Sequence, residues 1–167
     1  MTEHFAYKSC LTADGEGCIV KLSIPADAVT NEGRPGVVNR DTAKFKSTKA
    51  LVVSIHTFSG SKVREAFSQY DPMFKYKVGR VVISNIDGLI CGEGIHYYLT
   101  PVIYFTGVAS KGYTGHLTRY YDSGRIMEEG DYFHGNQEGR WIGYDETGQV
   151  CRMVFYSMGQ VSDIIKP

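Results

Sequence analysis

The sequence lacks the signatures of several common protein classes. Its 18 basic and 18 acidic residues cancel, so the chain carries no overall positive charge that would attract nucleic acid. No apolar run approaches about 18 residues, the length at which a membrane-spanning helix is indicated. The first residues, "MTEHFAYKSCL", contain no basic segment followed by an apolar one. We therefore expect neither a membrane span nor a signal peptide.

Motifs for metals, cofactors and nucleophilic catalysis are also missing. The four cysteines, Cys10, Cys18, Cys91 and Cys151, form no C-x-x-C pair, and the five histidines show no H-x-x-x-H spacing. The chain has no phosphate-binding G-x-x-x-x-G-K-[ST] loop, no dinucleotide-binding glycine fingerprint and no G-x-S-x-G motif. We expect no metal, no cofactor and no catalytic residue, and free thiols in a reducing intracellular environment.

What the chain does contain is typical of β structure. Its 19 glycines, 12 tyrosines and 8 phenylalanines indicate many turns joined by aromatic strands. The length of 167 residues suits one domain with a small appended unit. We predict a mainly β fold of the β-rich α+β class, with an antiparallel N-terminal domain over residues 1–108 and a hairpin extension over residues 109–167.

Three segments of the N-terminal domain are predicted strands. The segment "GCIVKLSIP" (17–25) alternates between two faces, and its inward face is expected to carry Val20, Leu22 and Ile24. Residues 49–58 form the most apolar run and are predicted to be a buried strand. Residues 74–83 alternate again, with a bulge or close backbone approach expected at Gly79.

Two further local features are predicted in the same half. Residues 63–70, "VREAFSQY", have apolar side chains at helical spacing, which predicts one short helix that Asp71-Pro72 ends. The sequence "IDGLI" predicts a hairpin turn at Asp87-Gly88. The region would then be a sheet with a single short helix.

The C-terminal third repeats itself with a period of 24 residues. Identical pairs at this offset are Gly115/Gly139, Tyr120/Tyr144, Gly124/Gly148, Tyr132/Tyr156 and Gly135/Gly159. Such a period predicts stacked hairpins in which each unit forms the core of its neighbour. Trp141 and Tyr144 are three residues apart, so a twist or a bulge near Gly143 is needed to place both on one face.

The repeated stretch "GHLTRYYDSGRIMEEGDYFHGNQEGRWIGYDETGQV" resembles the variant MORN repeat, whose unit is G-x-W-x-x-Y-x-x-x-G. Its second unit matches through Asn136, Gly139, Trp141, Tyr144 and Gly148, whereas the first has Leu117 in place of the tryptophan. The resemblance implies a scaffold that contacts proteins or lipids and does not imply catalysis. We expect an aromatic interaction surface at Tyr120, Tyr132, Trp141 and Tyr144, with core packing as the alternative role of these rings.

The first 110 residues resemble an uncharacterised domain of phages and large DNA viruses. The phrases that carry the resemblance are "GCIVKLSIPADA", "STKALVVSI", "YDPMFKYKVGRVV" and "CGEGIHYYLT", in that order. The resemblance implies a viral source and carries no activity. It leads us to expect a location in the host cytoplasm or in the virion.

The segment "CGEGIHYY" holds the densest group of polar side chains. A Cys–His pair with a nearby glutamate could provide a nucleophile, but an extended strand would place Glu93 and His96 on opposite faces. The alternative is a glycine turn followed by a strand whose His96 makes a buried hydrogen bond. If the segment lines a ligand pocket, the candidate residues are Tyr76, Cys91, Glu93, His96 and Tyr98. The same phrase is similar to the glycine-flanked strand that lines the NAD pocket of ADP-ribosyltransferases, although their other motifs are not found.

One local stretch is basic. Its cations are Arg34, Arg40, Lys44, Lys46 and Lys49, and only Asp41 opposes them. We interpret the stretch as a solvated loop and strand edge, with a phosphate or nucleic-acid contact as the alternative, and do not expect nucleic acid to be the main partner.

Together these patterns favour a non-enzymatic interaction or structural protein of viral origin, with a virion component as one form of it. It would bind a protein partner or a second copy of itself through the aromatic hairpin face or a sheet edge. The alternative is a nucleotide-binding or ADP-ribosyltransferase-like enzymatic domain with its pocket at "CGEGIHYY".

Overall fold

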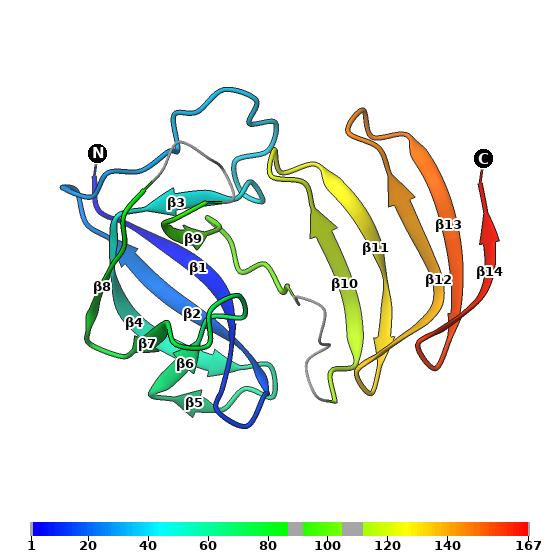
Figure 1. The fold of residues 1–167 in the computed structure, drawn as a ribbon, viewed down its shortest axis with the longest axis horizontal. Coiled ribbons are helices and arrows are strands. Elements are labelled where there is room, and N and C mark those ends of the chain that lie inside the picture. Colours follow the sequence, from blue (N-terminus) through cyan, green and yellow to red (C-terminus); the bar gives the residue numbers. More distant parts are fainter. Residues whose placement is uncertain (1, 87–91, 105–111, 167) are drawn as a thin grey trace.

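The computed structural model describes residues 2–86, 92–104 and 112–166, which form strands and no helix. A seven-stranded antiparallel sheet lies in the N-terminal half, in the order β5-β4-β2-β1-β6-β7, with β8 paired to β4. A two-stranded sheet, β3-β9, lies beside it, and a five-stranded sheet, β10 to β14, follows (Figure 1). The prediction of a mainly β fold is confirmed.

The N-terminal strands are β1 (His4–Leu11), β2 (Gly17–Ile24), β3 (Phe45–Ser47), β4 (Lys49–Thr57), β5 (Lys62–Val63), β6 (Glu65–Phe67), β7 (Lys75–Lys77), β8 (Val81–Ile83) and β9 (Ile95–Tyr97). Val20, Leu22 and Ile24 are buried on the inward face of β2, as predicted. Strand β4 alternates instead of being buried throughout, because Val52 and Ile55 face the core while Leu51 and Val53 are exposed.

Two local predictions in this half are wrong. Residues 63–70 are not a helix, because Glu65–Phe67 forms β6, which pairs with both β1 and β7. Ala66 points into the core while the Glu65 carboxylate binds Lys75 and Lys77 on β7, so strand pairing overrides the helical spacing. The predicted strand over 74–83 is two short strands, because the chain turns at Gly79, whose φ is +80°. The turn predicted at Asp87-Gly88 lies outside the described residues.

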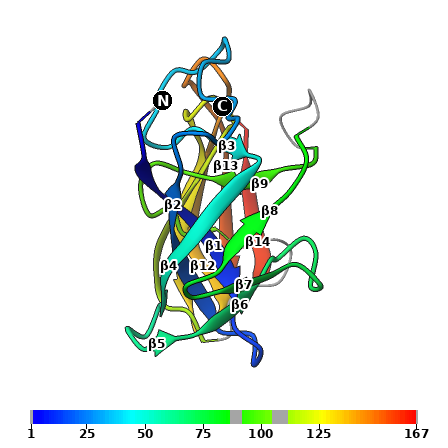
Figure 2. The same ribbon diagram turned by 90° about the vertical axis from the view of Figure 1, so that its left-hand side faces the viewer.

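The C-terminal sheet consists of β10 (Gly115–Tyr120), β11 (Ile126–Phe133), β12 (Asn136–Tyr144), β13 (Val150–Ser157) and β14 (Gln160–Ile165). It begins at β10, next to the N-terminal half, and extends away from it to β14 at the far end (Figure 1). Seen along that direction, the N-terminal strands lie in front of the hairpin strands (Figure 2).

The 24-residue repeat predicted from the sequence is present in the backbone. The two hairpin turns share the same hydrogen bonds: the Tyr121 amide donates to the Arg125 carbonyl at 2.8 Å, and the Asp145 amide donates to the Gln149 carbonyl at 2.9 Å. Gly124 and Gly148 occupy the same turn position, with φ angles of +88° and +91°. The bulge expected near Gly143 lies between Gly143 and Tyr144, and the first unit has its counterpart at Arg119/Tyr120.

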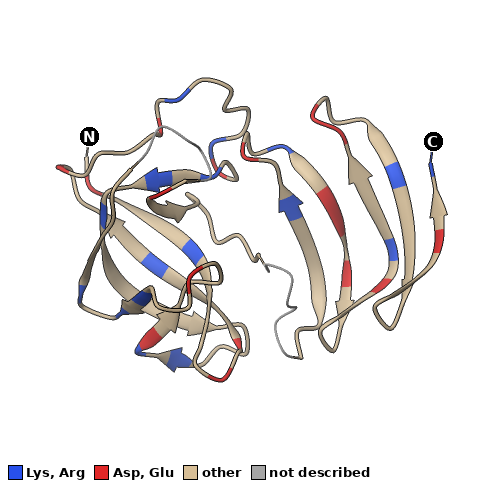
Figure 3. Ribbon diagram, in the orientation of Figure 1, with Lys and Arg blue, Asp and Glu red and all other residues tan. Residues whose placement is uncertain are grey.

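Two properties of the whole fold bear on function. None of the described residues belongs to a helix that could cross a membrane. Basic and acidic residues are interspersed along the ribbon of both halves (Figure 3).

Candidate functional site

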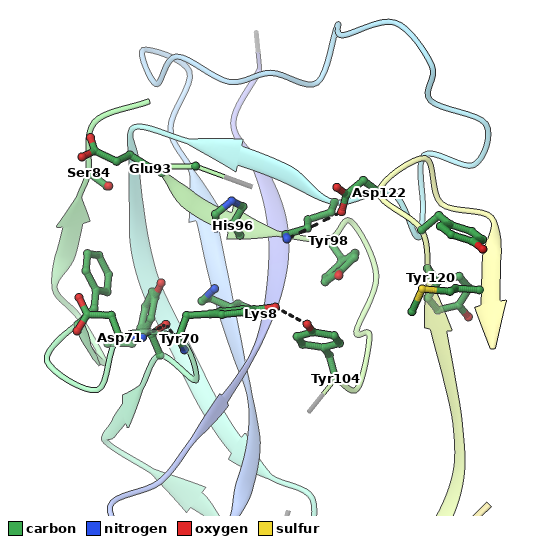
Figure 4. A pocket seen from close by; sticks show the side chains of 18 residues that line it. Lys8, Tyr70, Asp71, Ser84, Glu93, His96, Tyr98, Tyr104, Tyr120 and Asp122 are labelled. Atoms are coloured by element: carbon green, nitrogen blue, oxygen red, sulfur yellow. Dashed lines mark hydrogen bonds and ion pairs between the residues drawn. The ribbon is translucent and has the colours of Figure 1, made fainter. Parts of the chain in front are cut away.

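A cavity of about 610 Å³ lies where the N-terminal strands meet the first hairpin. Its lining comes from β1, β7 and β9, from the loop between β6 and β7, and from the start of the hairpin sheet (Figure 4). The lining residues are Lys8, Lys44, Ser68, Tyr70, Asp71, Phe74, Tyr76, Ser84, Gly92, Glu93, Gly94, His96, Tyr98, Tyr104, Tyr120, Tyr121, Asp122 and Met127. The size falls in the range of small-molecule sites, about 300–1,000 Å³.

Lys8 is the buried cation of this cavity. It lies on β1 between Ala6 and Cys10, and all three occupy the inward face of the alternating strand. Only 8% of Lys8 is exposed. Because the backbone of β1 pairs with β2 on one side, the strand cannot rotate to bring the side chain out into water.

No hydrogen bond or ion pair to the Lys8 ammonium group is found among the described residues, although its Nζ lies 5.9 Å from the centre of the Tyr76 ring. Burial lowers the pKa of Lys8, and the nearby Lys44 lowers it further, while the Cys10 thiol opposes both effects. A buried cation normally has a carboxylate or several acceptors around it. The Lys8 amine, whether charged or neutral, therefore has no hydrogen-bonding or charged partner among the described residues.

Tyrosines form much of the wall around Lys8. Tyr76 is 2% exposed, its ring packs on Phe74 at 5.2 Å between centres, and burial raises the pKa of its hydroxyl well above the usual value. The Tyr70 and Tyr104 rings stack at 6.1 Å, and their hydroxyl groups hydrogen-bond to each other. Rings of this kind offer flat apolar surfaces together with neutral hydroxyl donors.

Strand β9 and the residues that flank it bring Glu93, His96 and Tyr98 to the same cavity. Tyr98 lies beside β1 because its amide donates to the Tyr7 carbonyl at 2.8 Å and its carbonyl accepts from the Tyr7 amide at 2.8 Å. Gly94, with a φ of +131°, lies against the Lys46 side chain, where a Cβ atom would come within 3.0 Å. The chain turns at Gly94 into β9, and both Glu93 and His96 line the cavity.

The first hairpin turn closes the other side. The Ser123 carbonyl accepts hydrogen bonds from the amides of Val38 and Asn39, at 2.9 and 3.1 Å, and Thr42 donates to the Gly124 carbonyl at 2.7 Å. These contacts fix Asp122 so that its carboxylate lies 3.9 Å from the Lys44 ammonium. They also bring Tyr120, Tyr121 and Met127 to the cavity.

The ligand-pocket residues predicted from the sequence converge here in part. Tyr76, Glu93, His96 and Tyr98 all line the cavity, while Cys91 lies outside the described residues. Lys8 was not among the predicted residues. A charged residue at an inward position of the alternating stretch "HFAYKSCL" was the signal that could have identified it.

The four rings of the predicted interaction surface are separated by the fold. Trp141 and Tyr132 are core residues of the hairpin sheet, exposed by 2% and 6%, so they do not form an exposed face. Tyr120 lines the cavity. The Tyr144 hydroxyl donates to the Glu129 carboxylate at 2.7 Å. The physical reason is that the hairpins bury one face of their own sheet, with Trp141 lying over Gly130.

The basic stretch is in part a solvated loop, as predicted, since the Arg40 side chain is 54% exposed, but most of its cations are engaged within the molecule. Arg34 donates to the carbonyls of Lys44 and Asp122, and Arg40 pairs with Glu32 at 2.9 Å. Lys46 is 1% exposed, and Lys49 pairs with Asp27. Within the described ranges, no group of three potential metal ligands is found, and the described cysteines are free thiols.

The structure thus defines an all-β protein with an aromatic, lysine-containing cavity between its two halves. The chain belongs to a family of unknown function (DUF5758), whose model matches residues 2–102, more than half of the sequence. This agrees with the expectation of an uncharacterised N-terminal domain. Neither the curated proteins nor the solved structures contain a significant match to the chain.

Proposed function

We propose that the protein binds a small organic anion with a flat ring, such as a nucleotide or an aromatic acid, in the cavity around Lys8. The observation that carries this proposal is the Lys8 ammonium group, which is 8% exposed, lines a cavity of about 610 Å³ and has no charged partner among the described residues. An anionic ligand would supply that missing charge.

The remaining walls favour a ring-bearing ligand over a bare ion. The paired rings of Tyr70 and Tyr104 lie on one side of the cavity, and Tyr120 approaches from the hairpin sheet on the other (Figure 4). A planar group between such rings gains dispersion and stacking energy. Lys44, whose ammonium lies 3.9 Å from the Asp122 carboxylate, adds a second positive charge to the cavity wall.

A thermal-shift series followed by titration calorimetry tests the proposal. A ligand at about 100 times its Kd adds about 2.7 kcal/mol to the free energy of unfolding, which for a chain of this size is a shift of roughly 5–10 °C. Lys8→Met should abolish the shift, because it keeps the length and removes the charge. Lys21→Met is the matched control, since Lys21 lies on β2 with its ammonium over the Phe5 ring, outside the cavity. Equal shifts in both variants would contradict the proposal.

A second candidate function is protein interaction at the open edge of the hairpin sheet. All six residues of β14 are exposed, and within the described residues β14 pairs only with β13. Val161 and Ile164 are 53% and 55% exposed on this edge. An unpaired edge of this kind accepts an added strand. We propose that the hairpins are a MORN-like array that extends by pairing β14 with β14 of a second copy.

The viral setting and the host-cytoplasmic or virion location belong to this second proposal. Sedimentation velocity over a range of concentrations tests its physical part. The chain should dimerise, and Ile164→Lys should remain monomeric, because a charge on the apolar edge opposes strand addition. A chain that is monomeric at every concentration, with or without the substitution, would exclude the second-copy pairing.

A further inference from the structure

We propose that Lys8 is a nucleophilic amine that forms an imine with a ligand carrying an aldehyde or ketone group. The inference rests on the ligand-binding function proposed for the cavity and names the class of ligand. It is carried by the position of one primary amine, which is buried on β1, directed into the cavity and held by no acceptor among the described residues.

While no anion is bound, the surroundings of Lys8 favour the neutral amine, which is the reactive form. Lys8 lies on the inward face beside the fully buried Cys10 and near the Tyr76 ring, so water solvates its ammonium form poorly. Lys44 adds a second cation that lines the same cavity. Lysines that act as nucleophiles are activated in both of these ways, by an apolar pocket and by a neighbouring cation.

The groups that face the cavity with a charge or a titratable proton come from several elements. Lys44 and Asp122 pair with each other, and Asp71 accepts a hydrogen bond from the Met73 amide at 2.9 Å. Glu93, His96 and the tyrosine hydroxyls complete the set. Among the described residues, no ion pair joins any of these carboxylates to Lys8, so the amine lone pair is not held in an ion pair.

The step needs no oxidant and no further reactant. The Lys8 nitrogen lone pair forms a bond to the carbonyl carbon, and one amine proton moves to the carbonyl oxygen, which gives a carbinolamine. The second amine proton and the hydroxyl group then leave as water, and the carbon–nitrogen double bond forms. Tyrosine hydroxyls on the wall can carry these protons.

The walls select among carbonyl compounds. The stacked tyrosines favour a flat ring, and Lys44 favours a negative group at some distance from the carbonyl. Pyridoxal 5′-phosphate combines an aldehyde, a ring and a phosphate, and it serves here as a chemical probe of the site.

The experiment maps which lysine the probe modifies. The full chain is incubated with low concentrations of pyridoxal 5′-phosphate, reduced with borohydride to fix the imine, digested and analysed by mass spectrometry. A lysine of ordinary pKa is only about 0.1% neutral at pH 7.5, and each unit by which the pKa falls raises that fraction about tenfold. We expect Lys8 to be modified at least about tenfold faster than the exposed Lys62 and Lys75. Modification spread evenly over the surface lysines, with Lys8 not enriched, would overturn the inference.

Lys8→Arg separates this inference from the proposed function. Arginine keeps a positive charge but does not form the imine, so the variant should lose the fixed adduct while other lysines react as before. If anions bind in a Lys8-dependent manner but no adduct forms at Lys8, the imine is excluded and the binding site stands. If the adduct forms at Lys8 but no anion binds without a carbonyl, the imine stands and the anion site fails. The ranking of lysines in the unaltered chain decides the question even if the variant folds poorly.

Discussion

The two halves of the molecule bury their side chains by different means. The N-terminal strands wrap around a continuous core that includes Phe45, Tyr76 and Tyr97, all at most 2% exposed. In the hairpin sheet, the buried cluster among the described residues is Leu117, Tyr132, Trp141 and Val154, while β14 is exposed along its whole length. The N-terminal half is therefore stabilised by its interior, whereas the hairpins depend on lateral neighbours and on their attachment at β10.

The two repeat units sharpen the comparison, because nearly the same backbone serves two purposes. Both turns have a glycine with positive φ and the same pair of hydrogen bonds. The first turn contacts residues 38–43 and closes the cavity, while the second lies near the Arg125 side chain. The second hairpin therefore serves as scaffold, whereas the first also lines the cavity.

The largest expected effect is at Trp141. Trp141→Ala should cost about 3–5 kcal/mol, because the ring is 2% exposed and packs on Gly130, Tyr132 and Tyr156. Hydrogen exchange should show that the amides of β11 to β13 lose protection while those of β1, β2 and β4 keep theirs. Phe133→Ala, at a ring that is 56% exposed, is the control and should change stability by less than about 0.5 kcal/mol. Equal loss of protection in both halves would show that they unfold as one unit.

The next largest effect is the difference in stability between substitutions at the two turn glycines. Gly124→Ala and Gly148→Ala both place a side chain at a positive φ, at a cost of about 1–2 kcal/mol each. At Gly124 the new Cβ would also lie 2.1 Å from the Asn39 carbonyl oxygen, which is backbone, whereas at Gly148 the nearest atom is 3.5 Å away. Gly124→Ala should be the more destabilising by at least about 1 kcal/mol, and should weaken ligand binding because it moves Asp122 and Tyr120. Equal costs in denaturant titrations would mean that the first turn is not held against residues 38–43.

Local periodicity accounts for what the sequence could predict. The alternation of residues 17–25 and the 24-residue repeat depend on spacing within one segment, so the sequence predicts both. The irregularity beside Gly143 follows from the same spacing. The helix expected over 63–70 failed because β6 exists only through pairing with β1 and β7. The helical spacing of a few apolar residues is a weaker determinant of local structure than pairing with two neighbouring strands.

The cavity was only half predictable for the same reason. The segment "CGEGIHYY" stood out through its composition, and Glu93, His96 and Tyr98 do line the cavity. Lys8 and Lys44 come from distant parts of the chain, and Tyr120 and Asp122 arrive only because the first turn packs on residues 38–43. No sequence pattern within a single segment predicts that contact between the turn and the loop.

A smaller effect is expected from the thiols of the N-terminal core. Cys10 and Cys18 are fully buried cross-strand neighbours, and burial raises both pKa values to about 12 from an ordinary 9.0. A group whose pKa is raised by folding contributes its full stabilisation below the unfolded pKa and loses it as pH rises toward the folded one. Between pH 9 and 10 the free energy of unfolding should fall by up to about 1.4 kcal/mol per thiol.

Denaturant titrations at these two pH values, with Cys10→Ala and Cys18→Ala alongside, measure that slope. Each substitution costs some packing energy at every pH, so the quantity to compare is the change between pH 9 and 10. The slope should shrink with each substitution and be smallest in the double variant. An unaltered slope in the double variant would place the pH sensitivity elsewhere in the molecule.

The smallest effect is expected at the far edge of the hairpin sheet. Ile164→Ala should change the free energy of unfolding of the monomer by less than about 0.5 kcal/mol, because the residue is 55% exposed and its strand β14 pairs, among the described residues, only with β13. Leu117→Ala, at the attached edge, should cost about 2–5 kcal/mol, since Leu117 is 1% exposed. Unfolding is best measured at several protein concentrations. A cost at Ile164 that grows with concentration would mean that a second copy covers β14, because only association makes the stability of the chain depend on its concentration. A large cost that is independent of concentration would instead remove the contrast between the two edges of the sheet.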